Sequence, residues 1–87
     1  MDYNKNSNVL KALGHPIRLK IIEGLLTHDE CHVNIMAEKL LIPQSTISQH
    51  LSILKNAGII IPKKNGVKTC YKVVDKRVKK IISIFKN

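Results

Sequence analysis

Apolar residues recur every three or four positions through most of the first 57 residues, which is the spacing of one face of a helix. Gly14, Pro43 and Gly58 interrupt this pattern, and both residue types commonly mark helix boundaries. Residues 1–8 are polar and rich in Asn, so we expect a flexible lead-in ahead of one domain over residues 9–87. The pattern predicts four helices, over about residues 9–13, 16–26, 33–40 and 43–57.

After Gly58 the apolar residues change to the alternation of a β-strand. The runs IIIPKK and VKTCYKVV flank Asn65-Gly66, a dipeptide that tolerates the positive φ angles of a type I′ hairpin turn. A last amphipathic helix starts near Asp75. The sequence therefore predicts a mainly α-helical protein with a small β-hairpin (α+β), in the order of four helices, two strands and a fifth helix. Two helices joined by a tight break and followed by a hairpin are typical of a winged helix-turn-helix.

The net charge of +9 is distributed unevenly. Residues 1–54 hold five basic and five acidic residues, whereas residues 55–87 hold ten basic residues and one acidic residue. A basic half indicates a polyanionic partner, with DNA or RNA ahead of an anionic membrane. A solvated face that serves solubility is the ordinary alternative. The chain has no apolar run near the roughly 20 residues that span a bilayer and no signal-peptide pattern, so we expect a cytoplasmic protein without a membrane partner.

Residues 40–54 contain no formally charged side chain, although 24% of the whole chain is charged. In the predicted helix over residues 43–57, Ile47, Leu51 and Leu54 form an apolar stripe, and most other positions carry hydroxyl or amide groups. Such short polar groups can read base edges in the major groove, although ordinary helix capping also favours Ser and Thr. Together with the hairpin and the uneven charge, the pattern favours base reading by these residues: Gln44, Ser45, Thr46, Ser48 and Gln49.

The runs LKALGHPIRLKII and QSTISQHLSILKNAGII, followed by a hairpin that ends in YKV, resemble the ArsR/SmtB family of small dimeric bacterial repressors. The resemblance covers about residues 9–82. It implies a winged-helix homodimer that pairs through its first and last helices and binds a palindromic operator. The apolar positions of those two helices are the expected dimer interface: Val9, Leu10, Leu13, Val78, Ile81, Ile82 and Phe85.

Position by position, Gln44, Ser45, Ser48 and Gln49 match the base-reading helix of that family. The wing, which would contact the DNA backbone, matches these residues: Lys63, Lys64, Asn65 and Lys68. His50 lies at the position where the family usually has a histidine, and we group it with the contacts to the DNA backbone. We expect it to make a structural hydrogen bond rather than a base contact. His15 is expected to cap the helix that starts at Pro16.

Many members of the family release DNA when a metal binds, either to a Cys-Val-Cys pair at the start of the third helix or to an Asp/His set on the last helix. The matching stretch here is Cys31-His32-Val33, and the last helix has Asp75 but no His. No metal site is therefore predicted with certainty. Cys31 and His32 are the sensor candidates, with three interpretations left open: no inducer, redox chemistry of the thiol, or a weak site for a thiophilic metal ion.

The two cysteines, Cys31 and Cys70, are too few for a disulfide scaffold. A disulfide needs Cα atoms within about 7 Å, and nothing in the sequence brings these residues together. Cys70 is therefore expected to be a bystander on the hairpin.

An enzyme is not expected, because the chain has no glycine-rich phosphate loop, no paired carboxylates and no nucleophile triad, and we expect no small-molecule substrate. The sequence predicts a homodimeric transcriptional regulator of the repressor type that binds double-stranded DNA sequence-specifically. The alternative is a basic winged-helix module that binds RNA or an acidic protein partner. A dimeric repressor would prefer duplex DNA with two half-sites about one helical turn apart.

Overall fold

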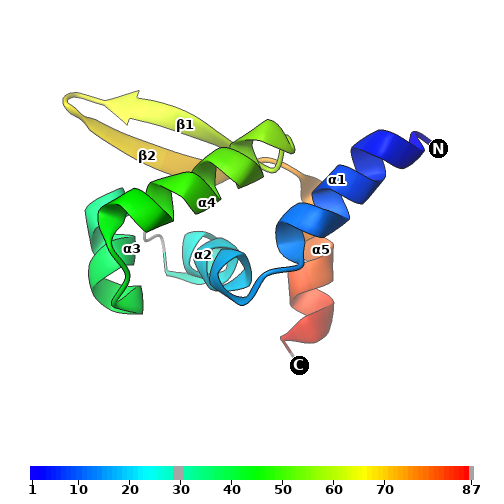
Figure 1. Ribbon diagram of the computed structural model, residues 1–87, viewed down its shortest axis with the longest axis horizontal. Coiled ribbons are helices and arrows are strands. Elements are labelled where there is room, and N and C mark those ends of the chain that lie inside the picture. Colours follow the sequence, from blue (N-terminus) through cyan, green and yellow to red (C-terminus); the bar gives the residue numbers. More distant parts are fainter. Residues whose placement is uncertain (29–30, 87) are drawn as a thin grey trace.

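The computed structural model describes residues 1–28 and 31–86, apart from the side chain of Asn65. Five helices and one hairpin follow the predicted order (Figure 1). Their bounds are α1 Tyr3–Leu13, α2 Pro16–Thr27, α3 Val33–Leu40, α4 Gln44–Asn56, β1 Ile60–Asn65, β2 Lys68–Val73 and α5 Lys76–Phe85. The predicted winged helix-turn-helix is therefore confirmed.

Helix α1 begins at Tyr3, so residues 3–8, which we expected as a lead-in, form part of this helix. The side chain of Asp2 accepts a hydrogen bond from the Lys5 N–H at 3.0 Å and caps the helix. The first turns of α1 are polar and show no apolar periodicity, because only the later part of α1 packs against the core. A hydrophobic pattern therefore does not predict them.

Helix α2 starts as predicted. Pro16 occupies its first turn, where a missing N–H is harmless, and His15 Nδ1 accepts a hydrogen bond from the Ile17 N–H at 3.1 Å. The expected capping role of His15 is confirmed.

The break between α3 and α4 is a tight turn at Leu41, whose φ of 57° lies in the left-handed region. Pro43 then precedes the first residue of α4. Ile47, Leu51 and Leu54 are all buried, which confirms the predicted stripe and fixes which side of α4 faces solvent.

The hairpin pairs β1 with β2 in antiparallel register, from Ile60 opposite Val73 to Asn65 opposite Lys68. Its two-residue turn is therefore Gly66-Val67 rather than the predicted Asn65-Gly66. Gly66 has a φ of 67°, so the residue with the freest backbone still supplies the positive angle that a tight hairpin needs.

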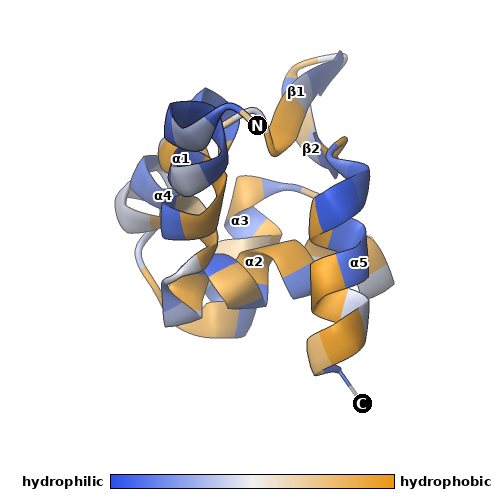
Figure 2. Cartoon of the chain, turned by 90° about the vertical axis from the view of Figure 1, so that its right-hand side faces the viewer, coloured by the Kyte–Doolittle hydropathy of each residue, from blue (hydrophilic) through white to orange (hydrophobic). Residues whose placement is uncertain are grey.

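A single apolar core lies between the helices and the base of the hairpin. Figure 2 shows that the beginning of α5 is hydrophilic and that its end is hydrophobic. No helix in the described part of the chain is long and apolar enough to cross a membrane. The buried core residues are Val9, Ala12, Leu13, Ile21, Ile22, Met36, Ile47, Leu51, Leu54, Ile59, Ile60, Val73, Val78 and Ile82.

Candidate nucleic-acid interface

The first half of α4 exposes Gln44, Ser45, Ser48 and Gln49, whereas Thr46 is half-buried. Since Ile47 and Leu51 hold the opposite side of the helix in the core, these four polar side chains face solvent together. The structure thus presents four of the five predicted base-reading residues and partly covers the fifth.

The polar side chains at the start of α4 are not used for capping. Pro43 is the N-cap residue, and no side chain among the described residues makes a capping hydrogen bond at the start of α4. Capping was the ordinary explanation for hydroxyl groups at this position, and the geometry contradicts it. The hydroxyl and amide groups are therefore available to a partner.

The hairpin carries Lys63, Lys64 and Lys68, all exposed. Lys63 lies opposite Cys70 and Lys64 opposite Thr69, in the half of the hairpin nearer its tip. The side chain of Asn65, the fourth predicted wing residue, lies outside the described residues. Along the long axis of the molecule, the hairpin tip and the beginning of α4 lie towards the same end (Figure 1).

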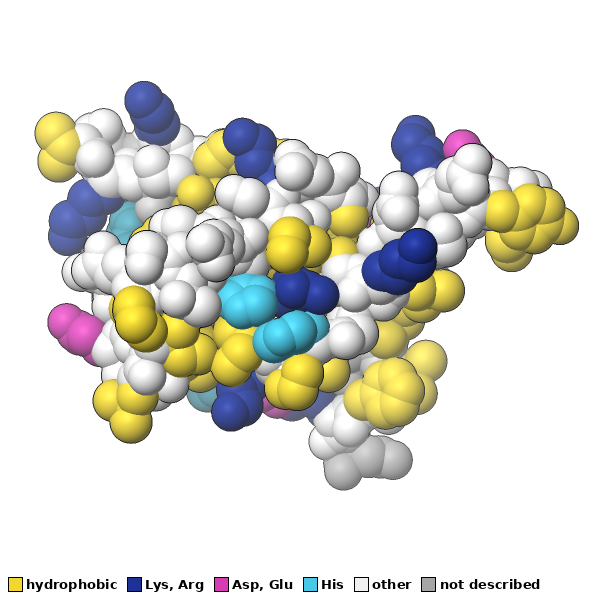
Figure 3. Space-filling view, in the orientation of Figure 1, with side chains coloured by type: hydrophobic (Ala, Val, Ile, Leu, Met, Phe, Trp, Pro, Cys, Tyr) yellow, Lys and Arg dark blue, Asp and Glu magenta, His cyan; other side chains and the backbone are white. Residues whose placement is uncertain are grey.

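Figure 3 shows mainly uncharged side chains over the part of this face that α4 covers, with separate Lys and Arg side chains outside that part. This separation matches the two chemical surfaces of DNA. Uncharged donors and acceptors suit base edges, and cations suit phosphates.

A polar network joins α4 to α1 and α2 through Arg18. Its Nε donates to the Ala12 carbonyl at 2.6 Å, at the end of α1. Its Nη1 lies 3.2 Å from His50 Nδ1 on α4. Because a guanidinium can only donate, His50 must accept with an unprotonated Nδ1.

The surroundings of His50 disfavour its protonated form. Burial is the main cause that lowers its pKa, and electrostatic interactions with His15 and Arg18 lower it further. The rings of His15 and His50 lie 4.7 Å apart between centroids. The expected structural hydrogen bond of His50 is confirmed, whereas its grouping with the DNA-backbone contacts stays a prediction.

Arg18 was not among the residues singled out from the sequence. A signal was present, since Arg18 directly follows His15-Pro16-Ile17 on a helix whose next buried residues are isoleucines. Its partner on α4, however, is 32 positions away in the chain, and no local pattern indicates that contact.

The predicted dimer residues divide into two groups. Val9, Leu13, Val78 and Ile82 belong to the core of the protomer, so they are not a free surface. They are buried because α1 and α5 turn their apolar faces inward. Ile81 is half-buried, and Leu10 and Phe85 are 61% and 83% exposed. Ile84, which we did not predict, is 70% exposed beside Phe85.

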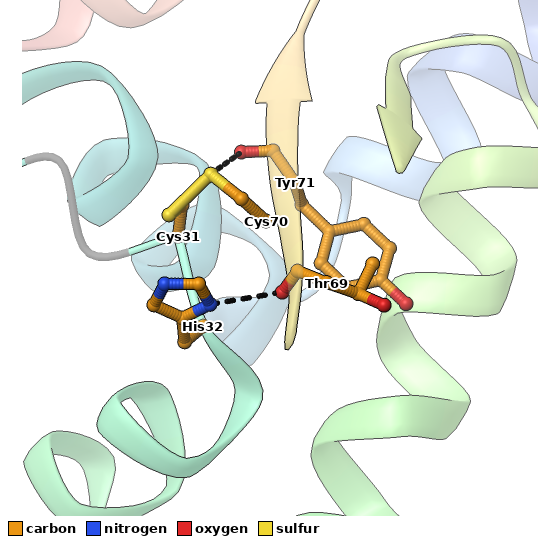
Figure 4. The surroundings of a disulfide bond; sticks show 5 residues. All are labelled: Cys31, His32, Thr69, Cys70 and Tyr71. Carbon is orange, nitrogen blue, oxygen red and sulfur yellow. Dashed lines mark hydrogen bonds between the residues drawn. A yellow bond between two sulfur atoms is a disulfide. The ribbon is translucent and has the colours of Figure 1, made fainter. Parts of the chain in front are cut away.

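Cys31 and Cys70 form a disulfide, with 4.7 Å between their Cα atoms (Figure 4). The expectations that they lie apart and that Cys70 is a bystander are therefore wrong. The segment before α3 runs beside β2, where the Tyr71 N–H donates to the Cys31 carbonyl at 3.0 Å. The ring nitrogen Nδ1 of His32 also lies 3.0 Å from the Thr69 carbonyl oxygen. The disulfide closes across 39 positions of sequence, so these contacts form only when the hairpin folds back.

Among the described residues, no group of three or more His, Cys, Asp or Glu side chains is placed to hold a metal ion. Asp75, the acidic residue of the last helix, accepts a hydrogen bond from the Arg77 N–H and pairs with its guanidinium at 2.8 Å. The hydrogen bond from the Arg77 side chain is the main reason that the pKa of Asp75 lies below its ordinary value.

A solvent-facing, uncharged helix start and a lysine-bearing hairpin on a winged helix-turn-helix define a DNA-binding protein. A family model described as "Bacterial regulatory protein, arsR family" matches residues 15–61, more than half of the chain. The chain belongs to the ArsR family, as its sequence resemblance implied, and is a DNA-binding transcriptional regulator.

Individual relatives agree with this assignment. The uncharacterised HTH-type transcriptional regulator MJ1325 of Methanocaldococcus jannaschii is 43% identical over 82 residues, which cover 94% of this chain and 92% of that protein. The transcriptional repressor PagR of Bacillus anthracis is 31% identical over 97% of this chain and 84% of its own length. The crystal structure of PagR superposes with a TM-score of 0.85 over 94% of this chain and 93% of that chain.

A third similar protein is Mb0332 from Mycobacterium bovis, described as a homodimeric winged helix-turn-helix DNA-binding domain. Its solution structure superposes with a TM-score of 0.82 at 25% sequence identity, over 95% of this chain and 76% of that chain.

Proposed function

We propose that this chain is a repressor that binds a palindromic operator as a homodimer. One observation carries the proposal. The uncharged start of α4 is exposed and has no capping hydrogen bond among the described residues, and it lies towards the same end of the molecule as a lysine-bearing hairpin tip. Gln44, Ser45, Ser48 and Gln49 would read base edges in the major groove.

The wing would contact phosphate through Lys63, Lys64 and Lys68, each exposed on the hairpin. Phosphate contacts supply affinity without sequence information and make binding dependent on salt. Removing a polar side chain of α4 and removing a wing lysine should therefore change DNA affinity in different ways.

Pairing would use the apolar residues that the protomer leaves exposed on α1 and α5, which include Leu10, Ile84 and Phe85. Two copies of α4 would then occupy successive major grooves, so the operator should contain two half-sites about one helical turn apart.

The experiment begins with selection of binding sites from random duplex DNA by the purified protein. Affinity is then measured for the selected duplex, a scrambled duplex and a structured RNA of equal length. We expect two inverted half-sites and clear preference for the selected duplex. Equal or tighter binding to the RNA would overturn the proposal in favour of an RNA-binding module.

Two variants then test the division of roles. Gln49→Ala should weaken binding to the selected duplex by about 1–3 kcal/mol and leave the scrambled duplex largely unaffected. Lys64→Ala should weaken binding to both duplexes. It should also reduce the slope of log affinity against log salt concentration by about one unit for each wing. Asn56→Ala, exposed at the far end of α4, is the matched control and should change neither. Equal losses on both duplexes for Gln49→Ala would contradict base reading.

A thiol or metal signal at Cys31 and His32 would require the reduced protein, because Cys31 is bonded to Cys70 in this structure. Reduced and oxidised protein should therefore both be tested with thiophilic ions in the same binding assay.

A further inference from the structure

The Cys31–Cys70 disulfide joins the two parts of the molecule that are expected to contact DNA. Cys31 directly precedes His32, the N-cap of α3, and α3 packs against α4 to form the helix-turn-helix. Cys70 lies within β2, opposite Lys63 of the wing. Figure 4 shows the bond bridging the segment before α3 and the wing strand.

The position of the bond along the hairpin matters. The base of the hairpin is fixed in the core by Ile60 and Val73, which are buried. Cys70 lies three residues beyond Val73 towards the tip, so the disulfide anchors the hairpin near its middle. The exposed lysines Lys64 and Lys68 lie beyond that anchor.

Besides the covalent bond, two hydrogen bonds join the segment before α3 to the middle of β2. One runs from the Tyr71 N–H to the Cys31 carbonyl, and the other joins His32 to the Thr69 carbonyl. Both lie in a partly solvated region where a hydrogen bond contributes about 1 kcal/mol, so they restrain the outer hairpin weakly.

Building on the operator binding proposed above, we propose that this disulfide is a redox-controlled strut that fixes the wing relative to α3 and α4, and that the oxidised protein binds its operator more tightly than the reduced protein. The sign follows from preorganisation. In the oxidised form Lys64 and Lys68 are held in one arrangement relative to α4, whereas the reduced hairpin must lose conformational freedom when it binds.

The chemistry requires only a low-molecular-weight thiol. Two thiol molecules transfer their protons to Cys31 and Cys70, the protein S–S bond breaks, and a new S–S bond forms between the two small molecules. The protein disulfide is reduced and the small thiol is oxidised. The reverse exchange with a small disulfide restores the bond. Both cysteines are half-buried rather than enclosed, so small reagents can reach them.

The compartment supports a switching role. A regulator acts where the chromosome is, and in most organisms small thiols keep that compartment reducing. Disulfides there are usually transient and redox-sensing rather than structural. The Cys31–Cys70 bond joins two parts expected to contact DNA, so a change in the ratio of reduced to oxidised small thiols would change operator affinity.

The test compares wild-type protein in oxidised glutathione and in dithiothreitol, with the disulfide state of each sample verified by mass spectrometry. On the selected duplex, we expect about tenfold weaker binding after reduction. The dependence on salt should stay the same, because the same lysines contact phosphate once the wing is ordered on the DNA. The variant with both Cys31→Ser and Cys70→Ser should bind like reduced wild type and should not respond to either reagent.

Hydrogen exchange of the free protein provides a readout independent of DNA. Reduction should accelerate exchange of amides in β2 near Thr69 and Cys70, while amides of the buried α4 stripe should be unchanged. Three results would each overturn the proposed role of the disulfide. They are equal operator affinity in both states, tighter binding by the reduced state, and a disulfide that does not form in oxidised glutathione. Failure of both forms to prefer any duplex would instead refute the proposed operator binding.

Discussion

Replacing Arg18 by Met tests whether the Arg18 network positions the recognition helix. Met keeps an unbranched side chain about as long as the methylene stem of Arg, so the substitution removes the hydrogen bonds and preserves the packing of that stem. It takes donors from the Ala12 carbonyl and from His50 Nδ1. The third bond of Arg18, to the Lys11 carbonyl, is exposed and 3.4 Å long, so its loss contributes little.

The expected loss of stability follows from those two bonds. Buried hydrogen bonds to a charged group contribute about 1.5–3 kcal/mol each, and Arg18 is only half-buried, which reduces each to about 1 kcal/mol. The free energy of unfolding should therefore fall by about 2 kcal/mol, or about 8–16 °C in Tm for a domain of this size.

Equilibrium unfolding in urea at one fixed protein concentration measures this change, because dimer formation makes apparent stability depend on concentration. Lys20→Met, an exposed position of the same helix, is the matched control and should stay within about 0.5 kcal/mol of wild type. A loss for Arg18→Met no larger than that of the control would refute the role given to the network.

Two further predictions concern pH and assembly. The pKa of His50 in the folded protein lies below its ordinary value of 6.5, so the unfolded chain binds the proton first. The contribution of neutral His50 to the free energy of unfolding is therefore complete above about pH 6.5 and declines as the pH falls through the lowered pKa. In urea unfolding, His50→Gln should lack this part of the pH dependence of stability. An unchanged pH dependence in the variant would contradict the assignment. Phe85→Asp should produce folded monomers in sedimentation and weaken operator binding, because Phe85 is 83% exposed and not needed for the core. Lys76→Asp, at the hydrophilic start of α5, should stay dimeric, and a dimeric Phe85→Asp would exclude this end of α5 from the interface.

The exposed apolar residues of α1 and α5 explain why a test of the dimer needs care. Ile82 was an expected interface residue, but it is buried in the protomer, so a charge there would unfold the chain rather than separate two copies. Phe85, in the last turn of the same helix, separates the two effects. Amphipathic periodicity identifies an apolar face, but it does not reveal whether the same chain or a second copy covers it.

Local signals account for most of what was predicted correctly. The stripe of Ile47, Leu51 and Leu54 needs only helical spacing, and the cap of His15 needs only the following Pro16 and Ile17. The start of α1 was placed too late, since a single Asp2 cap and polar helical turns leave no hydrophobic pattern. The hairpin turn was displaced by one residue because Asn65-Gly66 and Gly66-Val67 both place a glycine where a positive φ is needed.

By itself, the sequence determined the order of helices and strands, the uncharged start of the fourth helix and the lysines of the hairpin, because each depends on neighbours a few positions apart. Only the tertiary structure decided that Cys31 meets Cys70, that Arg18 reaches His50, and that α5 exposes Phe85 while burying Val78. These pairings join segments tens of residues apart. They exist only after the core has brought the hairpin and α4 against the rest of the chain, and nothing in the local composition of either partner encodes them.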